Sequence, residues 1–292
     1  MKRTTILVPP GIGDGYWVLV KLRGFLRTHG IQNPTIYVQD SAPRRSHGMW
    51  MRVPFVTWGG YAELPKARAS KVFARRAYRL PGYAVQRRVL GFDWFLSFNG
   101  SLDAGRSLDD ALPGPANWYE PMHDAALTGT HAAAYRQRFG RYVLCAFWEH
   151  GGYQKWLVPF GEDRITETLR LLADAGLTVV VMGAAWDRGA IADRLAAADP
   201  RFTGLVGETN FDELCGLVAG SAAVLGFPAG NTLLGPYFRR PTTLLWHNHY
   251  HRAMWRNSVP PDARDYHALD VVQATPGSVA DRVLGAEPAR AA

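Results

Sequence analysis

The chain has 292 residues, of which 47% are hydrophobic, a formal net charge of +8 and a mean hydropathy of −0.14. No apolar stretch approaches the roughly 18 residues of a membrane-spanning helix, and the run Ile6–Val8 is too short for the core of a signal peptide. We therefore expect a soluble globular protein, long enough for two domains. Cys145 and Cys215 lie in apolar patterns, which predicts buried free thiols in a reducing compartment.

The first half of the chain alternates strand-like and helical patterns. A strand at Thr4–Val8 leads through a glycine-rich turn, Gly11–Gly15, into an amphipathic helix over Tyr16–Thr28. Further strands are predicted at Thr35–Val38, Pro54–Gly60 and Phe92–Phe98, with a basic helical stretch between the last two. The segment Gly100–Pro121 is rich in Gly, Pro, Asp and Asn, which is typical of a loop.

The second half repeats the alternation more regularly, after a helical connector at His131–Arg138. Apolar strands are predicted at Tyr142–Phe147, Thr178–Met182, Leu205–Val206, Ala222–Gly226 and Thr242–Trp246, and helices at Glu162–Ala175, Ala190–Ala197 and Phe211–Ala219, the last capped by Asn210. This alternation predicts a parallel sheet with crossover helices. A turn of small residues, Pro228–Thr232, falls between a strand and a helix, where such sheets bind ligands. We expect two domains, residues 1–135 and 136–292.

Basic residues are concentrated in the first half. Residues 1–140 carry 19 Lys and Arg against 9 Asp and Glu, whereas the remainder carries 14 against 16. Between Lys66 and Arg88, eight basic residues occur without an acidic one, and Arg75, Arg76 and Arg79 are among them. Aromatic residues interleave this run, which suits a phosphate-rich partner. A solvated helix face explains the same pattern equally well.

Several motifs occur in the order found in one family of enzymes. V-V-x-M-G-x-x-x-D spans Val179–Asp187, LVGETNFDEL spans Leu205–Leu214, the pair Lys155-Trp156 follows a strand, and G-x-G-D spans Gly11–Asp14. Through these motifs the chain resembles glycosyltransferase family 9, the ADP-heptose lipopolysaccharide heptosyltransferases and their relatives. The resemblance covers most of residues 141–246 and about the first 30 residues, and its middle segments resemble bacteriophage-type members.

The resemblance implies an α/β fold of the GT-B type, in which two Rossmann-like domains face each other across a cleft. The N-terminal domain binds the acceptor and the C-terminal domain binds the nucleotide sugar. The reaction requires a base for the acceptor hydroxyl and positive potential at the departing diphosphate. The resemblance assigns Asp14 as the base, with Gly13 beside it on the acceptor side, and Lys155 as the diphosphate clamp. A helix N-cap at Asp14 and a surface lysine at Lys155 are the alternatives.

The nucleotide sugar is expected along the turns of the second half. Gly230, Asn231 and Thr232 open a helix, so their backbone N–H groups are suited to phosphate oxygens. Asp187 is a candidate ligand of a ribose hydroxyl, and Glu208 and Thr209 are candidate pocket residues. A plain tight turn at Gly230–Thr232 and a helix-start acid at Asp187 are the alternatives.

The donor-sugar site departs from the family pattern. The family's turn reads G-N-D-S-G-x-x-H, whereas Gly226–Leu233 reads GFPAGNTL. Pro228 replaces the sugar-contacting Asp and offers neither a polar side chain nor an N–H, so we expect a donor sugar other than heptose. His247 and His249, in a polar loop, are candidates for the missing contacts. With no acidic or Cys partner nearby, we expect no metal, and no cofactor apart from the nucleotide-sugar substrate.

Together these features predict a metal-independent, inverting glycosyltransferase of the bacterial cytoplasm, including that of a phage-infected host. The dense basic run favours DNA as the polyanionic acceptor, with a hydroxymethylated pyrimidine extruded from the stack. The lipopolysaccharide core is the alternative acceptor. A non-catalytic module that binds a nucleotide sugar or a polyanion is a third hypothesis, which the presence of both Asp14 and Lys155 disfavours.

Overall fold

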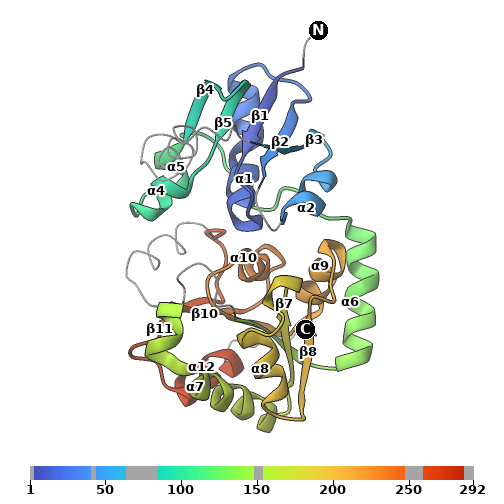
Figure 1. Cartoon of the computed structure of the whole chain (residues 1–292), viewed down its shortest axis with the longest axis vertical. Helices are drawn as coiled ribbons and strands as arrows, with labels where there is room; N and C mark the ends of the chain where they lie inside the picture. Colours follow the sequence, from blue (N-terminus) through green and yellow to red (C-terminus); the bar gives the residue numbers. More distant parts are fainter. Residues whose placement is uncertain (1–2, 41–43, 64–83, 148–153, 247–258, 286–292) are drawn as a thin grey trace. The chain divides into compact units, whose positions relative to one another are not determined.

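The computed structural model describes residues 3–40, 44–63, 84–147, 154–246 and 259–285, without the side chains of Asp103 and of residues 154–159. They form two compact units that divide between His123 and Asp124, with Val259 in the first unit and residues 260–285 in the second. Each unit combines its own sheet with its own helices (Figure 1). The prediction of two α/β domains is confirmed.

The first unit is built on a five-stranded sheet in the order β3-β2-β1-β5-β4. Its strands are β1 (Thr5–Val8), β2 (Thr35–Gln39), β3 (Thr57–Ala62), β4 (Val85–Val89) and β5 (Phe92–Leu96), and its described helices are α1 (Ile12–Thr28), α2 (His47–Arg52), α4 (Asn99–Asp103) and α5 (Leu108–Ala111). All neighbouring strands run parallel except β4, which is antiparallel to β5.

The predicted basic helix is wrong at its C-terminal end, where the structure has strand β4. Arg87 and Arg88 lie on this strand, because the chain turns back through Leu90 and Gly91 at positive φ (54° and 86°) and pairs with β5. Glycine adopts such a conformation at little cost, and the pairing supplies hydrogen bonds that periodicity does not reveal. The rest of the run, including Arg75, Arg76 and Arg79, lies outside the described residues.

The predicted loop Gly100–Pro121 is wrong in part, because it contains most of α4 and all of α5. Ser107 begins α5 by accepting a hydrogen bond from the backbone N–H of Asp110 at 3.1 Å. The Asp110 carboxylate accepts in return from the N–H of Ser107 at 2.8 Å. Such reciprocal capping is a signal for the start of a helix. The prediction of a loop instead relied on the Gly and Pro content of the segment.

Helix α1 begins at Ile12, four residues before the predicted start at Tyr16, and Gly11 is its N-cap. Gly13 and Asp14 therefore lie in its first turn. A Cβ atom at Gly15 would lie 2.6 Å from Met49 Cε and 3.2 Å from Trp50 Nε1. Close packing against α2 thus explains a glycine inside this helix.

The second unit is built on a six-stranded sheet in the order β11-β10-β9-β6-β7-β8, and its strand pairs are parallel. The strands are β6 (Tyr142–Ala146), β7 (Thr178–Gly183), β8 (Phe202–Val206), β9 (Ala223–Gly226), β10 (Thr242–Trp246) and β11 (Tyr266–Asp270). The helices are α6 (Ala125–Phe139), α7 (Gln154–Asp174), η1 (Ala185–Asp187), α8 (Ile191–Ala197), α9 (Phe211–Gly220), α10 (Gly230–Tyr237) and α12 (Pro276–Gly285). Strand β11 and helix α12 have no counterpart in the prediction.

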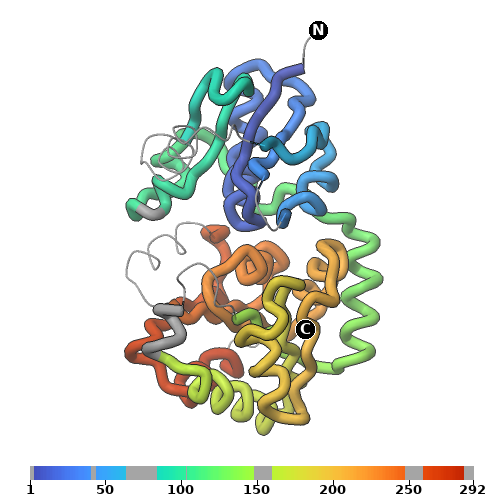
Figure 2. Tube along the Cα trace, viewed as in Figure 1, coloured from blue at the N-terminus to red at the C-terminus, as the bar shows by residue number. Residues whose placement is uncertain are grey.

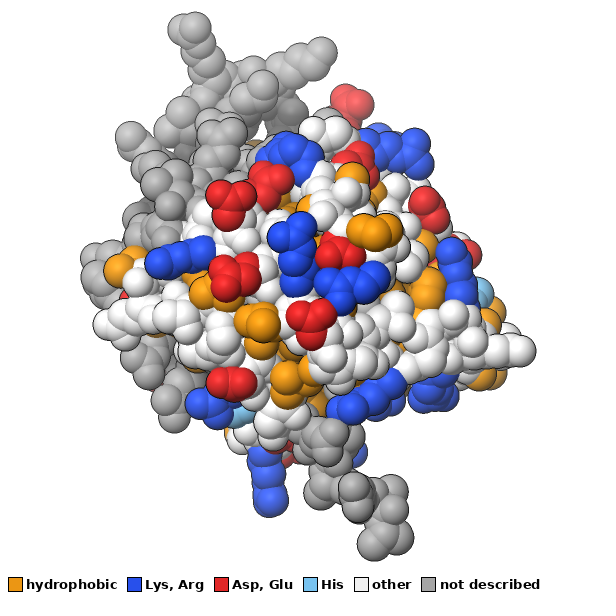
Figure 3. Space-filling view, turned by 90° about the horizontal axis from the view of Figure 1, so that it is seen from below, with side chains coloured by type: hydrophobic (Ala, Val, Ile, Leu, Met, Phe, Trp, Pro, Cys, Tyr) orange, Lys and Arg blue, Asp and Glu red, His pale blue; other side chains and the backbone are white. Residues whose placement is uncertain are grey.

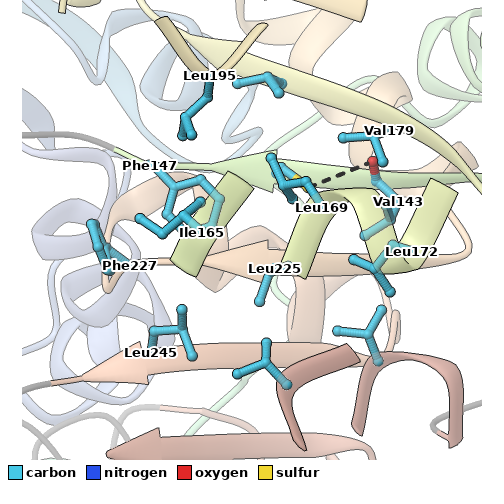
Figure 4. Close-up of a cluster of buried hydrophobic side chains, with 14 of the residues drawn as sticks. Val143, Phe147, Ile165, Leu169, Leu172, Val179, Leu195, Leu225, Phe227 and Leu245 are labelled. Carbon is cyan, nitrogen blue, oxygen red and sulfur yellow. Dashed lines mark hydrogen bonds between the residues drawn. The ribbon is translucent and has the colours of Figure 1, made fainter. Parts of the chain in front are cut away.

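The core of this unit lies between its sheet and helix α7 (Figure 4). Ile165, Leu169 and Leu172 follow helical spacing and point from α7 to the strands, as an amphipathic helix requires. Cys145 belongs to the same core, and burial raises the pKa of its thiol above the ordinary value. Cys145 and Cys215 are both buried and do not form a disulfide with each other, as predicted, and burial is typical of inert structural cysteines.

Helix α6 packs along α9 within the second unit (Figure 2). A Cβ atom at Gly216 would lie 2.2 Å from His131 Cβ, and one at Gly220 would lie 3.0 Å from the Ala132 carbonyl oxygen. The two helices therefore touch along a seam of glycines on α9. This contact places α6 with the second unit, whereas the sequence-based boundary at residues 135/136 divides the helix.

Replacing Gly216 by Ala is expected to lower the free energy of unfolding by about 1–3 kcal/mol, because the added methyl group overlaps His131. Gly129→Ala is the matched control: Gly129 is exposed on α6, with nothing within 4 Å of a new Cβ atom. There the substitution should stabilise the helix by about 1 kcal/mol. Urea unfolding of both variants measures the two effects. Equal effects of one sign would contradict the tight seam.

Candidate active site

In each sheet, the chain first adds strands on one side of a central strand and then adds strands on its other side. We call the place between that central strand and its neighbour on the second side the reversal point. In the first unit, β2 and β3 are added on one side of β1 and β5 lies on the other. In the second unit, β7 and β8 lie on one side of β6, and β9, β10 and β11 on the other. Sheets of this kind bind ligands outside the carboxyl ends of the strands at such points.

In the second unit, β6 and β9 approach each other very closely at this point. A Cβ atom at Gly226 would lie 2.1 Å from the carbonyl oxygen of Ala146, so a larger residue does not fit. Just beyond, the rings of Phe147 and Phe227 meet edge to face with centroids 5.1 Å apart. Both rings are buried, and the turn Pro228–Thr232 directly follows Phe227.

Helix α10 begins at this turn, after Ala229 as N-cap. The hydroxyl of Thr232 accepts from the Ala229 N–H at 2.9 Å, and the N–H of Thr232 donates to the Ala229 carbonyl at 3.1 Å. The polar groups of Thr232 thus fix the turn itself. Gly230 and Asn231 are half-buried, and their N–H groups occupy helix positions that lack intrahelical acceptors. These two N–H groups are the candidate phosphate donors.

The other predicted residues of the second unit follow strands at the same edge. Asp187 ends η1 after β7 and is buried, and its carboxylate accepts from the Ala184 N–H at 2.8 Å. Glu208 is exposed and Thr209 half-buried, both just after the edge strand β8. Strand β8 lies two strands from β6, roughly 10 Å away at ordinary strand spacing. Asp187 is therefore nearer to the β6–β9 point than Glu208 and Thr209 are.

Lys155 lies in the first turn of α7, the helix that follows β6, and its side chain is outside the description. Helix α7 begins at Gln154, before the predicted start at Glu162, and it is interrupted at Gly161, whose φ is 74°. His247 and His249 follow β10 and lie outside the described residues. Pro228, the first residue of the turn, is buried.

In the first unit, Asp14 lies just beyond the carboxyl end of β1. It is half-buried, and its Oδ2 lies 2.6 Å from the position of a Cβ atom at Gly11. The carboxylate thus folds over Gly11, and a side chain at that residue would displace it. Because Gly11 is the N-cap, Asp14 is a first-turn residue and the N-cap alternative is wrong. As an acidic residue in the first turn, it complements the positive end of the α1 dipole.

Sequence reasoning missed a group of polar residues that follows the neighbouring strand β5. Ser97 and Ser101 are buried, and Asn99 is half-buried. Among the described residues, no hydrogen-bond partner reaches Ser97 Oγ, Ser101 Oγ or Asn99 Oδ1. The Ser-x-Asn-x-Ser spacing after an apolar run could have indicated a polar site at the end of a strand. The predicted strand Phe92–Phe98 included Ser97 and so hid this pattern. These residues and Asp14 follow the two strands at the reversal point of the first unit.

The described part of the chain contains no group of three or more His, Cys, Asp and Glu residues that would hold a metal ion. Across these same residues, none of the helices combines the length and the apolar character needed to traverse a bilayer.

Solved structures with low sequence identity share the fold of the chain, whereas no protein-family profile and no curated sequence matches it significantly. Escherichia coli ADP-heptose lipopolysaccharide heptosyltransferase II has a TM-score of 0.63 at 15% identity, over 98% of each chain. A family 9 glycosyltransferase from Veillonella parvula has a TM-score of 0.56 at 10% identity, over 98% of this chain and 97% of that one. A UDP-GlcNAc 2-epimerase from Methanocaldococcus jannaschii has a TM-score of 0.52 at 7% identity, over 97% and 92%. The chain therefore has the GT-B-type fold of two Rossmann-like domains, which glycosyltransferases and epimerases share.

Proposed function

We propose that the protein is a glycosyltransferase that uses a nucleotide-diphosphate sugar. The supporting observation is that the reversal point of each sheet carries one half of the required chemistry. The second unit offers the N–H groups of Gly230 and Asn231 at the start of α10, and the first unit offers the carboxylate of Asp14. The heptosyltransferases that share the fold add weight to transfer over epimerisation.

In the proposed reaction, Asp14 removes the proton of an acceptor hydroxyl while the hydroxyl oxygen attacks the anomeric carbon. The bond from that carbon to the diphosphate oxygen breaks, and the diphosphate departs with the electron pair. Attack from the face opposite the leaving group inverts the anomeric configuration. Lys155 and the N–H groups of Gly230 and Asn231 stabilise the growing negative charge. Asp187, Glu208 and Thr209 are the proposed contacts to the rest of the nucleotide.

The donor sugar is proposed to differ from heptose, because Pro228 offers a sugar hydroxyl neither a polar side chain nor a backbone N–H. Incubation with a panel of nucleotide sugars and acceptors, followed by mass spectrometry, tests the reaction and the donor together. The expected result is a mass increase of one sugar on one acceptor class. Nucleotide binding without transfer to any acceptor would instead support a binding module.

The acceptor is proposed to be a phosphate-bearing molecule bound by the first unit, whose sequence holds the basic excess. The lipopolysaccharide core is the first candidate, because an ADP-heptose lipopolysaccharide heptosyltransferase shares the fold. DNA with a hydroxymethylated pyrimidine is the second candidate, and the uninterrupted basic run Lys66–Arg88 favours it.

Salt dependence separates the two acceptors. If DNA is bound, its affinity should fall linearly on a log–log plot against salt, and the double variant R75Q/R76Q should reduce the slope by about 1 per arginine that contacts a phosphate. Arg164→Gln, on α7 of the second unit, is the control and should leave the slope unchanged. Fluorescence anisotropy with a labelled duplex measures the slope. Absent or salt-independent binding would remove DNA as the acceptor.

A further inference from the structure

One turn at the carboxyl edge of the second sheet holds a tryptophan at the surface. Trp186 is the middle residue of η1, which follows β7 directly, and it is 38% exposed. It is the only exposed Trp, Tyr or Phe in the part of the chain that the structure describes. Large aromatic side chains at the surface are common in binding sites, because a rigid ring covers a ligand at little entropic cost.

The turn that carries Trp186 is packed tightly against the ends of β7 and β8. A Cβ atom at Gly207, just after β8, would lie 2.8 Å from Ala185 Cα, and one at Gly183 would lie 3.0 Å from Asp187 Cβ. The Gly207 N–H donates to the Gly183 carbonyl at 2.8 Å, which joins the two strand ends. The two glycines therefore allow the turn to lie directly on the edge of the sheet.

Hydrogen bonds fix the residues on both sides of Trp186. The Asp187 carboxylate accepts from the Ala184 N–H at 2.8 Å, and the Asp187 N–H donates to the Ala184 carbonyl at 2.9 Å. The Nε of Arg188 donates to the Val206 carbonyl at 3.4 Å. The backbone that carries the indole is thus held in place before any ligand binds, which lowers the entropic cost of binding.

The position of this turn relies on the order of the strands. Strand β7 lies beside β6, and β6 lies beside β9, which leads into α10. Trp186 and the start of α10 therefore follow strands of one edge that are roughly 10 Å apart at ordinary strand spacing. Ligands of such sheets lie at the reversal point, here between β9 and β6. A nucleotide with its diphosphate at the start of α10 crosses this point and extends its base toward β7, where Trp186 lies.

Charged side chains elsewhere in the second unit do not offer an equivalent site. Arg201 contacts Asp174 at 2.6 Å, and Arg194 contacts Glu162 at 2.9 Å. Basic and acidic side chains likewise lie next to one another over the middle of the face drawn in Figure 3. Because opposite charges alternate there, this area does not concentrate positive potential on an anionic nucleotide.

We propose that the indole of Trp186 stacks on the base of the donor nucleotide. The inference rests on the proposed function and adds the group that holds the base. Stacking uses the flat face that every base has, so Trp186 contributes affinity for the base with little selection between bases.

The test compares probes that share a diphosphate but differ in whether they carry a base. The full chain is titrated calorimetrically with ADP, GDP, UDP and inorganic pyrophosphate in phosphate-free buffer. Trp186→Leu keeps an apolar side chain and removes the flat ring. It should weaken binding of the tightest nucleotide about 5- to 100-fold, the usual effect of losing one stacked aromatic side chain. Pyrophosphate affinity should not change, because pyrophosphate has no base.

Two controls separate Trp186 from the start of α10 and from exposed apolar residues in general. Gly230→Pro should weaken the binding of nucleotide and of pyrophosphate alike, because it removes a phosphate donor. Val272→Ala shortens a side chain of the same unit that is 60% exposed, and it should change neither affinity. Retained pyrophosphate binding in Trp186→Leu also shows that this variant is folded.

Trp186→Phe supplies a readout that a merely structural role would not move. The smaller ring still stacks, so nucleotide affinity should stay within a few-fold of wild type. Quenching of tryptophan fluorescence by the nucleotide should nevertheless decrease, because the stacked indole is absent. If Trp186→Leu does not fold, this fluorescence change carries the test, and unchanged quenching would overturn the inference.

The remaining outcomes distinguish this inference from the proposed function. Nucleotide affinity that is unchanged in a folded Trp186→Leu variant, or that falls there in parallel with pyrophosphate affinity, would overturn the role of Trp186 and leave the proposed function standing. Wild type that binds none of the three nucleotides would overturn the proposed function, and the role of Trp186 with it.

Discussion

An Asp14→Asn variant is expected to lose roughly 100- to 10,000-fold in kcat/KM for sugar transfer, the usual contribution of a general base. The amide keeps the shape of the side chain but accepts no proton. Helix α1 should persist, because its N-cap is Gly11 and its first turn packs on α2. Nucleotide affinity should stay unchanged, since the proposed nucleotide contacts all belong to the second unit. Initial rates and calorimetric titration with the nucleotide measure the two quantities.

The matched control is Glu63→Gln, which removes an exposed carboxylate from the same unit. Its turnover should equal that of wild type. Asp14→Glu should retain part of the activity, because it keeps the base and shifts its position. Full turnover in Asp14→Asn would exclude Asp14 as the base.

A Gly230→Pro variant is expected to bind the nucleotide sugar about 10- to 100-fold more weakly, the contribution of one hydrogen bond to a charged group. Proline removes the N–H at the first helical position, where its fixed φ is otherwise well tolerated. The preceding residue, Ala229, is extended at φ −154° and ψ 167°, a conformation compatible with a following proline. The fold should therefore survive while one phosphate donor is lost.

Gly230→Ala is the control for this change, because it adds a side chain and keeps the N–H. Its nucleotide affinity should remain within a few-fold of wild type. The stability of both variants should match wild type in urea unfolding. Equal nucleotide affinity of the proline and alanine variants would place the diphosphate away from the start of α10.

Periodicity predicted the second unit better than the first, for a physical reason. Strands such as β10, Thr242–Trp246, are buried throughout and read as apolar runs with the same bounds in the sequence. Strand β4 instead carries Gln86, Arg87 and Arg88, and it exists because it pairs with β5 across a tight turn. Such pairing is a tertiary effect that composition does not encode.

The candidate site likewise contains features that the sequence predicts and features that only tertiary contacts explain. The turn at Gly230–Asn231 was accessible from the sequence, because strand, small residues and helix are consecutive. The early start of α1 was not, since Gly13 and Gly15 are poor helix formers in isolation, and only the folded structure shows the contact with α2 that explains Gly15. The polar residues after β5 gained significance only when the sheet order placed that strand beside β1.

The glycine seam between α6 and α9 also constrains how the sequence can diverge. Gly216 and His131 are far apart in the chain, yet their positions share one small volume. A larger residue at position 216 is compatible with the fold only if α6 shifts or position 131 becomes smaller. Among relatives that keep this contact, the two positions should vary together, and that pairing offers a marker for the second unit where overall identity is low.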